Sequence, residues 1–125
     1  MTLTLTRLSG DYAITRLPAD ASIPDWADGA GLVSVTRALD ELSVVCRAAR
    51  VPDGLESSKG WTALRVDTLA ALDTPGVVRD AVTPVSNAGL GVFVISSHLR
   101  DHLLIRTADA ARATAALTAA GHDIG

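Results

Sequence analysis

The sequence predicts an α+β fold in which short strands alternate with two helices. Three observations support this class. Several short segments alternate polar and apolar residues, which is the period of a half-buried strand. Apolar residues recur at spacings of three and four between residues 78 and 88, as on one face of a helix. An alanine-rich segment near the C-terminus predicts a second helix, because alanine has the highest intrinsic helix propensity.

The first part of the chain is predicted to form four strands. Polar and apolar residues alternate over residues 3–8. Tyr12–Leu17 is a second strand candidate, which Pro18 ends. Val33–Leu39 and Leu42–Ala48 predict two more strands around a turn at Asp40–Glu41. These four segments therefore predict two pairs of short strands.

Two stretches rich in proline and glycine separate the predicted strands. Residues 18–31 predict a loop with one helical turn near Pro24–Ala27. Val51–Gly60 is predicted to be a linker because of its proline, glycine and serine content. Trp61–Val66 follows this linker and predicts a further strand.

A helix is predicted to begin at Thr74–Pro75. Threonine is a favoured N-cap, and proline is favoured at the first helical position. Pro84 lacks a backbone donor and predicts a kink or a split inside this helix. Gly89 fits the left-handed residue that ends a helix. The residues at helical spacing, which predict the buried face, are Val78, Ala81, Val82, Val85 and Ala88.

The last part of the chain is predicted to form a hairpin followed by a helix. Leu90–Ser97 and His102–Arg106 are the two strands of the hairpin. Ala110–Ala120 is the alanine-rich helix, and only His122–Ile124 remains for a closing strand. From Trp61 onward, strand, helix, two strands and helix follow one another, which is the ferredoxin-like order.

The chain is therefore predicted to contain two unequal half-domains, residues 1–56 and residues 57–125. Each would be ferredoxin-like, with an antiparallel sheet and helices on one face. The first half has the strands of this fold but lacks two full helices.

The composition argues against nucleic-acid and membrane partners. The chain has 125 residues, a net charge of −3, 48% hydrophobic residues and 20% charged residues. A nucleic-acid-binding protein would need a clustered basic face, and the few aromatic residues offer no platform for stacking bases. No segment approaches the ~18 consecutive apolar residues of a membrane span.

The single cysteine and the N-terminal sequence predict a cytoplasmic protein. Cys46 cannot form an intrachain disulfide, which suits a reducing compartment. The first eight residues alternate in polarity and lack the continuous apolar core of a signal peptide.

Two segments resemble a known family. Ser34–Cys46 and Ala88–Ile105 are similar to the paired signatures of small tandem ACT-domain proteins, a group that includes the CASTOR-type arginine sensors. Shorter segments follow the same pattern in the same order, namely Gly10–Leu17, Ile23–Trp26, Gly60–Val66 and Ala120–His122.

The resemblance implies ACT-type half-domains that bind an amino acid where ACT units meet. It also implies a homodimer, because the arginine sensors carry four ACT units in one chain whereas two are predicted here. The loop positions that it assigns to ligand binding are Ser34, Val35, Asn87, Gly89, Leu90, Ser97, His98 and Asp101. Glycine lets the backbone approach a ligand closely, serine offers a hydroxyl, and Asp101 offers a charge for a ligand cation.

Structural roles stay open for several of these residues. Gly89 also serves as a helix stop, and aspartate is common in hairpin tips such as that of Asp101. His98 and His102 have metal-ligand spacing only on a helix, so a hairpin argues against a metal site. Cys46 is predicted to be a buried packing residue rather than a nucleophile.

The sequence therefore favours a non-catalytic sensor of a small ligand, an amino acid above all, without cofactor or metal. Ligand binding would shift the population between two arrangements of the half-domains. The main alternative is a structural or protein-interaction dimer module without a ligand. A third hypothesis is a small enzyme that uses Cys46 or His98.

Overall fold

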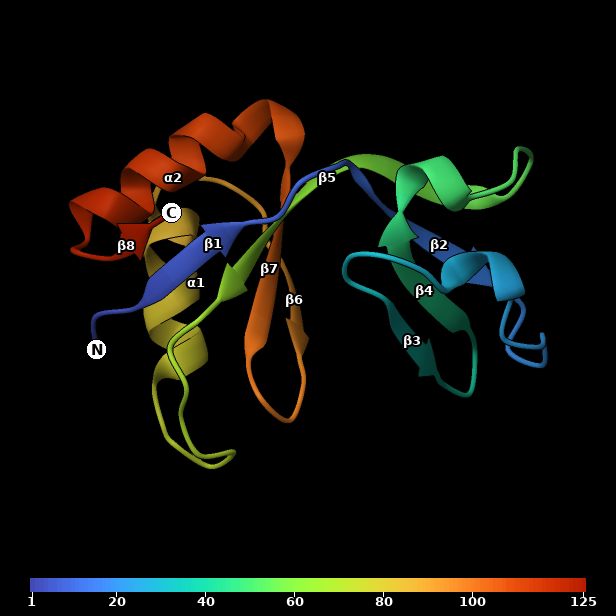
Figure 1. Cartoon of the computed structure of the whole chain (residues 1–125), viewed down its shortest axis with the longest axis horizontal. Helices are drawn as coiled ribbons and strands as arrows, with labels where there is room; N and C mark the ends of the chain where they lie inside the picture. Colours follow the sequence, from blue (N-terminus) through green and yellow to red (C-terminus); the bar gives the residue numbers. More distant parts are fainter. The chain divides into compact units, whose positions relative to one another are not determined.

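The computed structural model describes residues 1–125 and divides into two compact units (Figure 1). The N-terminal unit is Ser9–Trp61. The C-terminal unit combines Met1–Leu8 with Thr62–Gly125. Strand β5 (Glu56–Val66) contributes its first residues to the N-terminal unit and its last residues to the C-terminal unit.

The C-terminal unit has the strand–helix–strand–strand–helix–strand order of a ferredoxin-like fold, with one additional strand from the start of the chain. This confirms the α+β class. Its elements in chain order are β1 (Thr4–Arg7), the end of β5, α1 (Val77–Asn87), β6 (Phe93–Ser96), β7 (Asp101–Arg106), α2 (Ala110–Ala119) and β8 (Asp123–Ile124).

The strands of the C-terminal unit lie in the order β6-β7-β5-β1-β8. β6 pairs antiparallel with β7, and β1 pairs antiparallel with β5. The short β8 joins the far side of β1 in parallel, with Leu5 opposite Ile124. The extra strand β1 thus takes the place between β5 and the closing strand.

One face of this sheet is apolar and packs against both helices. The alternation in β1, β5 and β7 directs every second side chain to that face. Helix α2 contributes alanines, which bring its backbone close to the sheet. The buried cluster comprises Leu3, Leu5, Leu64, Val66, Leu103 and Ile105 from strands, Leu90 from the connection after α1, and Ala81, Val85, Ala113 and Leu117 from helices.

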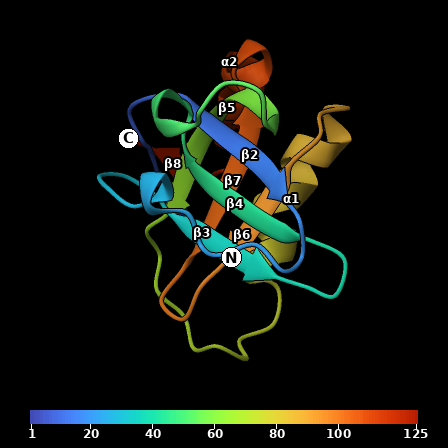
Figure 2. The ribbon, with the colours of Figure 1, turned by 90° about the vertical axis from the view of Figure 1, so that its right-hand side faces the viewer.

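The N-terminal unit has three antiparallel strands, β3, β4 and β2, with the start of β5 beyond β2 (Figure 2). Short 3₁₀ turns stand where two α-helices would complete the fold. Cys46 lies in its buried core with Leu42 and Val44, as the alternation predicts. The bounds are β2 (Tyr12–Leu17), η1 (Asp25–Ala27), β3 (Ser34–Arg37), β4 (Leu42–Arg47) and η2 (Ala48–Arg50).

The predicted linker Val51–Gly60 is wrong over its second half, because β5 begins at Glu56. This part of β5 pairs with β2, for example Ser57 with Thr15, and the two hydroxyls lie 2.9 Å apart. Gly60, at φ +84°, is an extra residue where the register shifts. A glycine read as a linker signal thus marks a β-bulge.

The two compact units of the structure and the two predicted half-domains have different bounds at the start of the chain. Met1–Leu8 belongs to the C-terminal unit, because β1 pairs with β5 and β8. The change of unit along β5 falls after Trp61 rather than at residue 56. The ACT-like character of each predicted half, 1–56 and 57–125, stays a prediction.

Helix α1 begins later than predicted. Its N-cap is Gly76 at φ +90°, a left-handed conformation that prevents Thr74 and Pro75 from continuing the helix. The backbone N–H of Thr74 instead donates to the carbonyl of Ala71, which forms a turn. Thr74 is therefore not the N-cap.

Pro84 does not split α1, which runs unbroken from Val77 to Asn87. The missing N–H of Pro84 leaves the carbonyl of Asp80, four residues earlier, without its helical donor. The ring Nε2 of His122 lies 2.9 Å from this carbonyl, and the N–H of Leu3 donates to Nδ1 at 2.9 Å. These two contacts require the tautomer with its proton on Nε2, so a histidine from the C-terminal segment replaces the helical hydrogen bond.

The predicted ends of both helices are close to the observed ones. After α1, the N–H of Leu90 reaches the carbonyl of Val85 and Gly89 takes φ +80°, which confirms the glycine stop. Helix α2 ends at Ala119, one residue before the predicted end. Neither helix has the length and apolar character that crossing a bilayer requires.

Replacing His122 by leucine is expected to lower the free energy of unfolding by about 2–4 kcal/mol, because the buried N–H of Leu3 and the part-buried carbonyl of Asp80 both lose their contact with the ring. Urea denaturation measures this. His98→Leu is the matched control, since His98 is exposed, and it should change stability by less than about 0.5 kcal/mol. Equal unfolding midpoints for the two variants would contradict the role assigned to His122.

Candidate functional site

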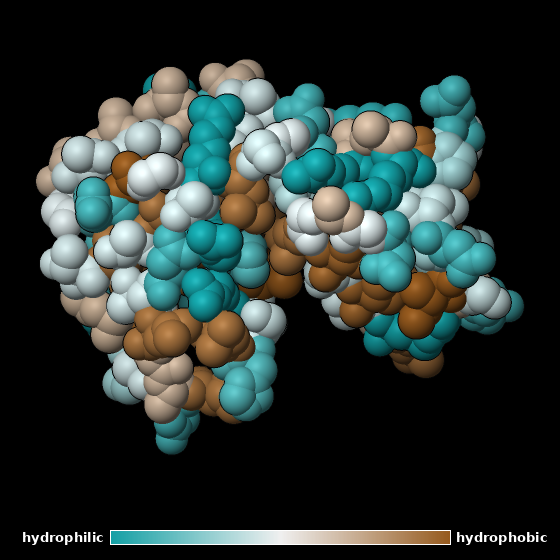
Figure 3. Space-filling view, in the orientation of Figure 1, coloured by the Kyte–Doolittle hydropathy of each residue, from teal (hydrophilic) through white to brown (hydrophobic).

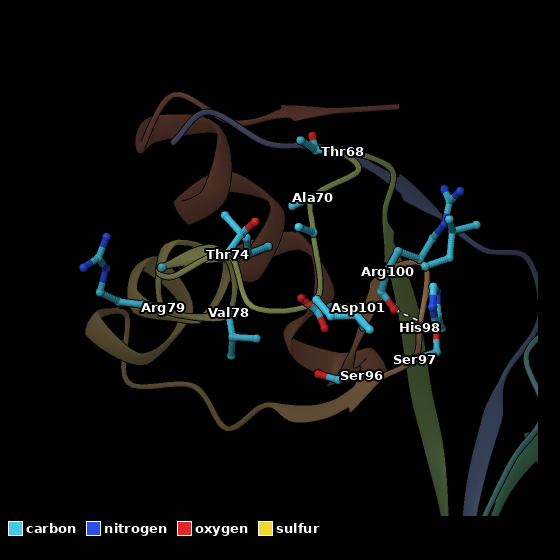
Figure 4. A pocket seen from close by; sticks show the side chains of 15 residues that line it. Thr68, Ala70, Thr74, Val78, Arg79, Ser96, Ser97, His98, Arg100 and Asp101 are labelled. Carbon is cyan, nitrogen blue, oxygen red and sulfur yellow. Dashed lines mark hydrogen bonds between the residues drawn. The ribbon is translucent and has the colours of Figure 1, made fainter.

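A pocket of about 250 Å³ opens at one end of the C-terminal unit (Figure 4). Three segments form its walls: the loop from Thr68 to Thr74, the first turn of α1, and the tip of the β6–β7 hairpin from Ser96 to Asp101. The volume lies below the range of about 300–1,000 Å³ that is usual for drug-sized ligands. The pocket is therefore of a size for a small metabolite.

The carboxylate of Asp101 points into this pocket, toward the loop and the start of α1 (Figure 4). Asp101 begins β7 and is partly buried. Its side chain makes no hydrogen bond or ion pair within the chain. It is thus a carboxylate ready to accept a cationic group from a ligand.

The opposite wall is the N-terminal end of α1. Its N-cap, Gly76, has no side chain with which to accept the first backbone N–H groups of the helix. These N–H groups and the helix dipole make this wall electropositive. Arg79 follows in the first turn, but it donates to Asp80 and points away from the pocket. The pocket thus has an acidic side at Asp101 and an electropositive side at α1.

Asp67 connects the base of the loop with the β6–β7 hairpin. It accepts hydrogen bonds from Thr6 at 2.5 Å and from Arg65 at 2.6 Å, and it also contacts Arg100 of the hairpin at 3.4 Å. Burial raises the pKa of Asp67, but these hydrogen bonds and the two guanidinium charges outweigh it and leave the pKa below its ordinary value. Asp67 is therefore ionised at neutral pH and holds the base of the loop to the hairpin.

The loop and the hairpin tip are fixed by short hydrogen bonds. The Thr68 hydroxyl accepts the N–H of Thr4 at 2.9 Å. The Ser97 hydroxyl donates to the carbonyl of Arg100 at 2.8 Å across the tip. The hydroxyl of Ser97 is thus occupied within the hairpin, whereas Ser96 lines the pocket beside Asp101.

The structure brings three predicted site residues together and separates others from them. Ser97, His98 and Asp101 all line the pocket, although the exposed His98 ring lies on the other side of the hairpin. Asn87 is the last residue of α1 and Gly89 follows it, about 15 Å along the helix from its first turn. A Cβ atom added at Gly89 would have no neighbouring atom of the chain within 4 Å, so the space beside Gly89 is empty.

The remaining predicted residues have other surroundings. Leu90 packs in the core of the C-terminal unit, so only its backbone is available to a ligand. Ser34 and Val35 belong to β3 of the N-terminal unit. Val35 lines a separate pocket of about 470 Å³ with Ile23 and Pro24 there. A ligand role for Ser34, Val35, Asn87, Gly89 and Leu90 stays a prediction.

Sequence reasoning missed the loop from Thr68 to Thr74 and the first turn of α1. The loop has neither strand nor helix periodicity, so it carried no pattern. One signal was present: Leu69 and Leu72 are large apolar residues in a segment otherwise rich in loop residues, and both are exposed in the structure.

Cys46 is placed for packing rather than for catalysis. Its side chain is fully buried in the core of the N-terminal unit. Burial raises the pKa of this thiol, and the charge of Arg50 opposes the effect only in part. The thiol is therefore protonated at neutral pH and is a poor nucleophile.

Comparison with known proteins decides the family. The sequence model of the ACT domain matches residues 56–119, which is half of the chain. The chain belongs to the ACT domain family. A second model, described as an N-terminal domain, matches residues 10–54. The ACT match contains the whole pocket, from Thr68 to Asp101.

Solved structures support this assignment. A structural-genomics protein from Agrobacterium tumefaciens is 40% identical, with a TM-score of 0.95 over 100% of this chain and 93% of that one. A protein of unknown function from Vibrio cholerae, described as a possible transport protein, is 20% identical, with a TM-score of 0.76 over 95% of this chain and 90% of that one.

The ACT fold is also that of aspartate kinase regulatory subunits. The ligand-free regulatory subunit from Thermus thermophilus is 12% identical, with a TM-score of 0.61 over 94% of each chain. These distant structures confirm the fold, which is one found in regulatory proteins. Among curated proteins, none matches this chain.

The titration of His102 is expected to make the stability of the fold depend on pH. Burial lowers the pKa of His102, the charges of Arg65 and Arg100 lower it further, and Asp101 and Asp67 oppose them in part. The unfolded chain therefore binds more protons than the folded one below the ordinary histidine value of 6.5. The free energy of unfolding should fall as pH drops below about 6.5 through the lowered pKa.

His102→Phe should flatten this dependence between about pH 5 and pH 7, because it removes the titrating ring. Urea denaturation across this range measures it. The partly buried carboxylate of Asp67 acts at lower pH, since its pKa is held below the ordinary value of 3.8. His98→Phe should keep the native slope, and an unchanged slope in His102→Phe would contradict the assignment.

Proposed function

We propose that this chain is a non-catalytic regulatory module that binds a free amino acid in the pocket of its ACT unit. The observation that carries the proposal is the Asp101 carboxylate, which points into the pocket and has no partner within the chain. A carboxylate in this position can bind a cationic group, and the α-ammonium of an amino acid supplies one.

The opposite wall suits the other charge of the same ligand. The first turn of α1, without a capping side chain at Gly76, offers backbone N–H groups to a carboxylate. The hydroxyls of Thr74 and Ser96 line the space between the two walls and can complete the hydrogen bonds. A zwitterion lying across the pocket thus satisfies both sides at once.

The relatives agree with a regulatory role. The distant structures of the same fold include regulatory subunits of aspartate kinase, and one aspartokinase III from E. coli is described in complex with aspartate and ADP. This chain covers 33% of that aspartokinase. We extend to this chain the regulation by a small ligand, acting in the cytosol and without a cofactor. A homodimer that joins ACT units of two copies is part of the proposal, as is the likeness to CASTOR-type sensors.

A structural or protein-interaction module without a ligand is the second candidate. The exposed leucines Leu69 and Leu72 beside the pocket favour it, because a protein surface could cover them. The two functions differ in one respect that can be measured, since only the first predicts stabilisation by amino acids.

Thermal unfolding with each of the common amino acids at millimolar concentration tests the proposal. At least one amino acid should raise the unfolding temperature, since a ligand at 100 times its Kd adds about 2.7 kcal/mol of stability. Asp101→Asn should weaken binding of that amino acid by about 10–100-fold, because it removes a charged partner.

Asp40→Asn is the matched control for Asp101→Asn. Asp40 is an exposed aspartate in a turn of the N-terminal unit, and its replacement should leave the affinity unchanged. The absence of a temperature shift with every amino acid would refute ligand sensing and favour the interaction module.

A further inference from the structure

Besides its two charged sides, the pocket has a wall that is partly apolar and exposed to solvent. Leu72 of the loop is 71% exposed, Leu99 of the hairpin tip is 55% exposed, and Val78 of α1 is 39% exposed. Hydrophobic residues gather over this end of the C-terminal unit (Figure 3). Each of the three walls of the pocket thus contributes one large apolar side chain that water still reaches.

These side chains belong to the pocket itself rather than to a scattered surface. Leu72, Val78 and Leu99 all line it, together with Ala70, Ala71 and Val77. When a ligand covers apolar surface that is exposed to water in the free protein, the free energy of binding becomes more favourable. The ligand that binds most tightly therefore has an apolar part of its own, in addition to the charged groups that bind Asp101 and α1.

Both guanidinium groups of the pocket wall already contact a carboxylate of the chain. Arg79 is paired with Asp80 and points outward, and Arg100 contacts Asp67. An acidic ligand side chain would compete with Asp80 and Asp67 for these cations. A basic ligand side chain would compete with the α-ammonium of its own molecule for Asp101.

We infer that the pocket selects amino acids with aliphatic side chains, such as leucine, isoleucine and valine, through Leu72, Val78 and Leu99. The inference rests on the proposed function, because it assigns the α-ammonium of the ligand to Asp101. It goes further by naming the class of the ligand side chain and the residues that recognise it. The aliphatic group covers the three exposed side chains and so binds the loop, the helix and the hairpin together.

Isothermal titration calorimetry with pairs of ligands of matched shape tests the selectivity. Leucine is compared with asparagine, and valine with threonine, because each pair differs in polarity far more than in size. Leucine should bind at least about tenfold more tightly than asparagine, since each buried methylene group contributes about fourfold. Arginine and aspartate complete the set as basic and acidic ligands.

Substitutions in the apolar wall test the residues. Leu72→Gln and Leu99→Gln should each weaken leucine binding by about three- to tenfold. Both should leave asparagine binding within about twofold of the native value. Both side chains are exposed, so the fold should tolerate the change, and circular dichroism checks this. Leu39→Gln, at a side chain 99% exposed in the N-terminal unit, is the matched control and should not alter either affinity.

The outcomes separate this inference from the proposed function. If amino acids bind but asparagine, aspartate or arginine binds as tightly as leucine, the aliphatic selectivity is wrong and the proposed function stands. Native leucine affinity in both Leu72→Gln and Leu99→Gln would also overturn the assigned residues. If no amino acid binds, the proposed function fails, and the inference fails with it.

Discussion

The Asp67 carboxylate is the interaction on which the geometry of the pocket depends. It stands where β5 ends, and from there it binds Thr6 of β1, Arg65 of β5 and Arg100 of the hairpin. Its lowered pKa keeps it ionised, so the contact persists at neutral pH. Arg100 contacts Asp67, whereas the neighbouring Asp101 is unpaired within the chain and points toward α1.

His122 also makes hydrogen bonds that join distant parts of the C-terminal unit. One imidazole accepts from Leu3 and reaches the carbonyl that Pro84 leaves free in α1. The ring thereby joins the first strand, the first helix and the C-terminal segment of the C-terminal unit. Helix α1 therefore runs unbroken from Val77 to Asn87 in spite of a proline in its interior.

The sequence predicted the elements whose signals are local. Alternating side chains located β1 and β4, and helical spacing with Gly89 located the body and the end of α1. The errors came from interactions between distant residues. Glu56–Gly60 has the composition of a linker and becomes a strand only because β2 pairs with it. The effect of Pro84 depends on His122, which lies 38 residues later in the chain.

The candidate site shows the same limit. The hairpin tip was recognised through Ser97, His98 and Asp101, because turn residues between two apolar strands are a local signal. The loop from Thr68 to Thr74 carried no periodicity, so its position opposite the hairpin followed only from the fold. Conversely, Asn87 and Gly89 were grouped with the hairpin, whereas the length of α1 keeps them at its other end.

The most direct test of the account is a map of where an amino acid binds. Amide chemical shifts recorded by NMR during a titration with leucine should change around Thr68–Arg79 and Ser96–Asp101, on both sides of the pocket. Shifts confined to Asn87–Leu90 or to Ser34 and Val35, with none around Asp101, would contradict the account.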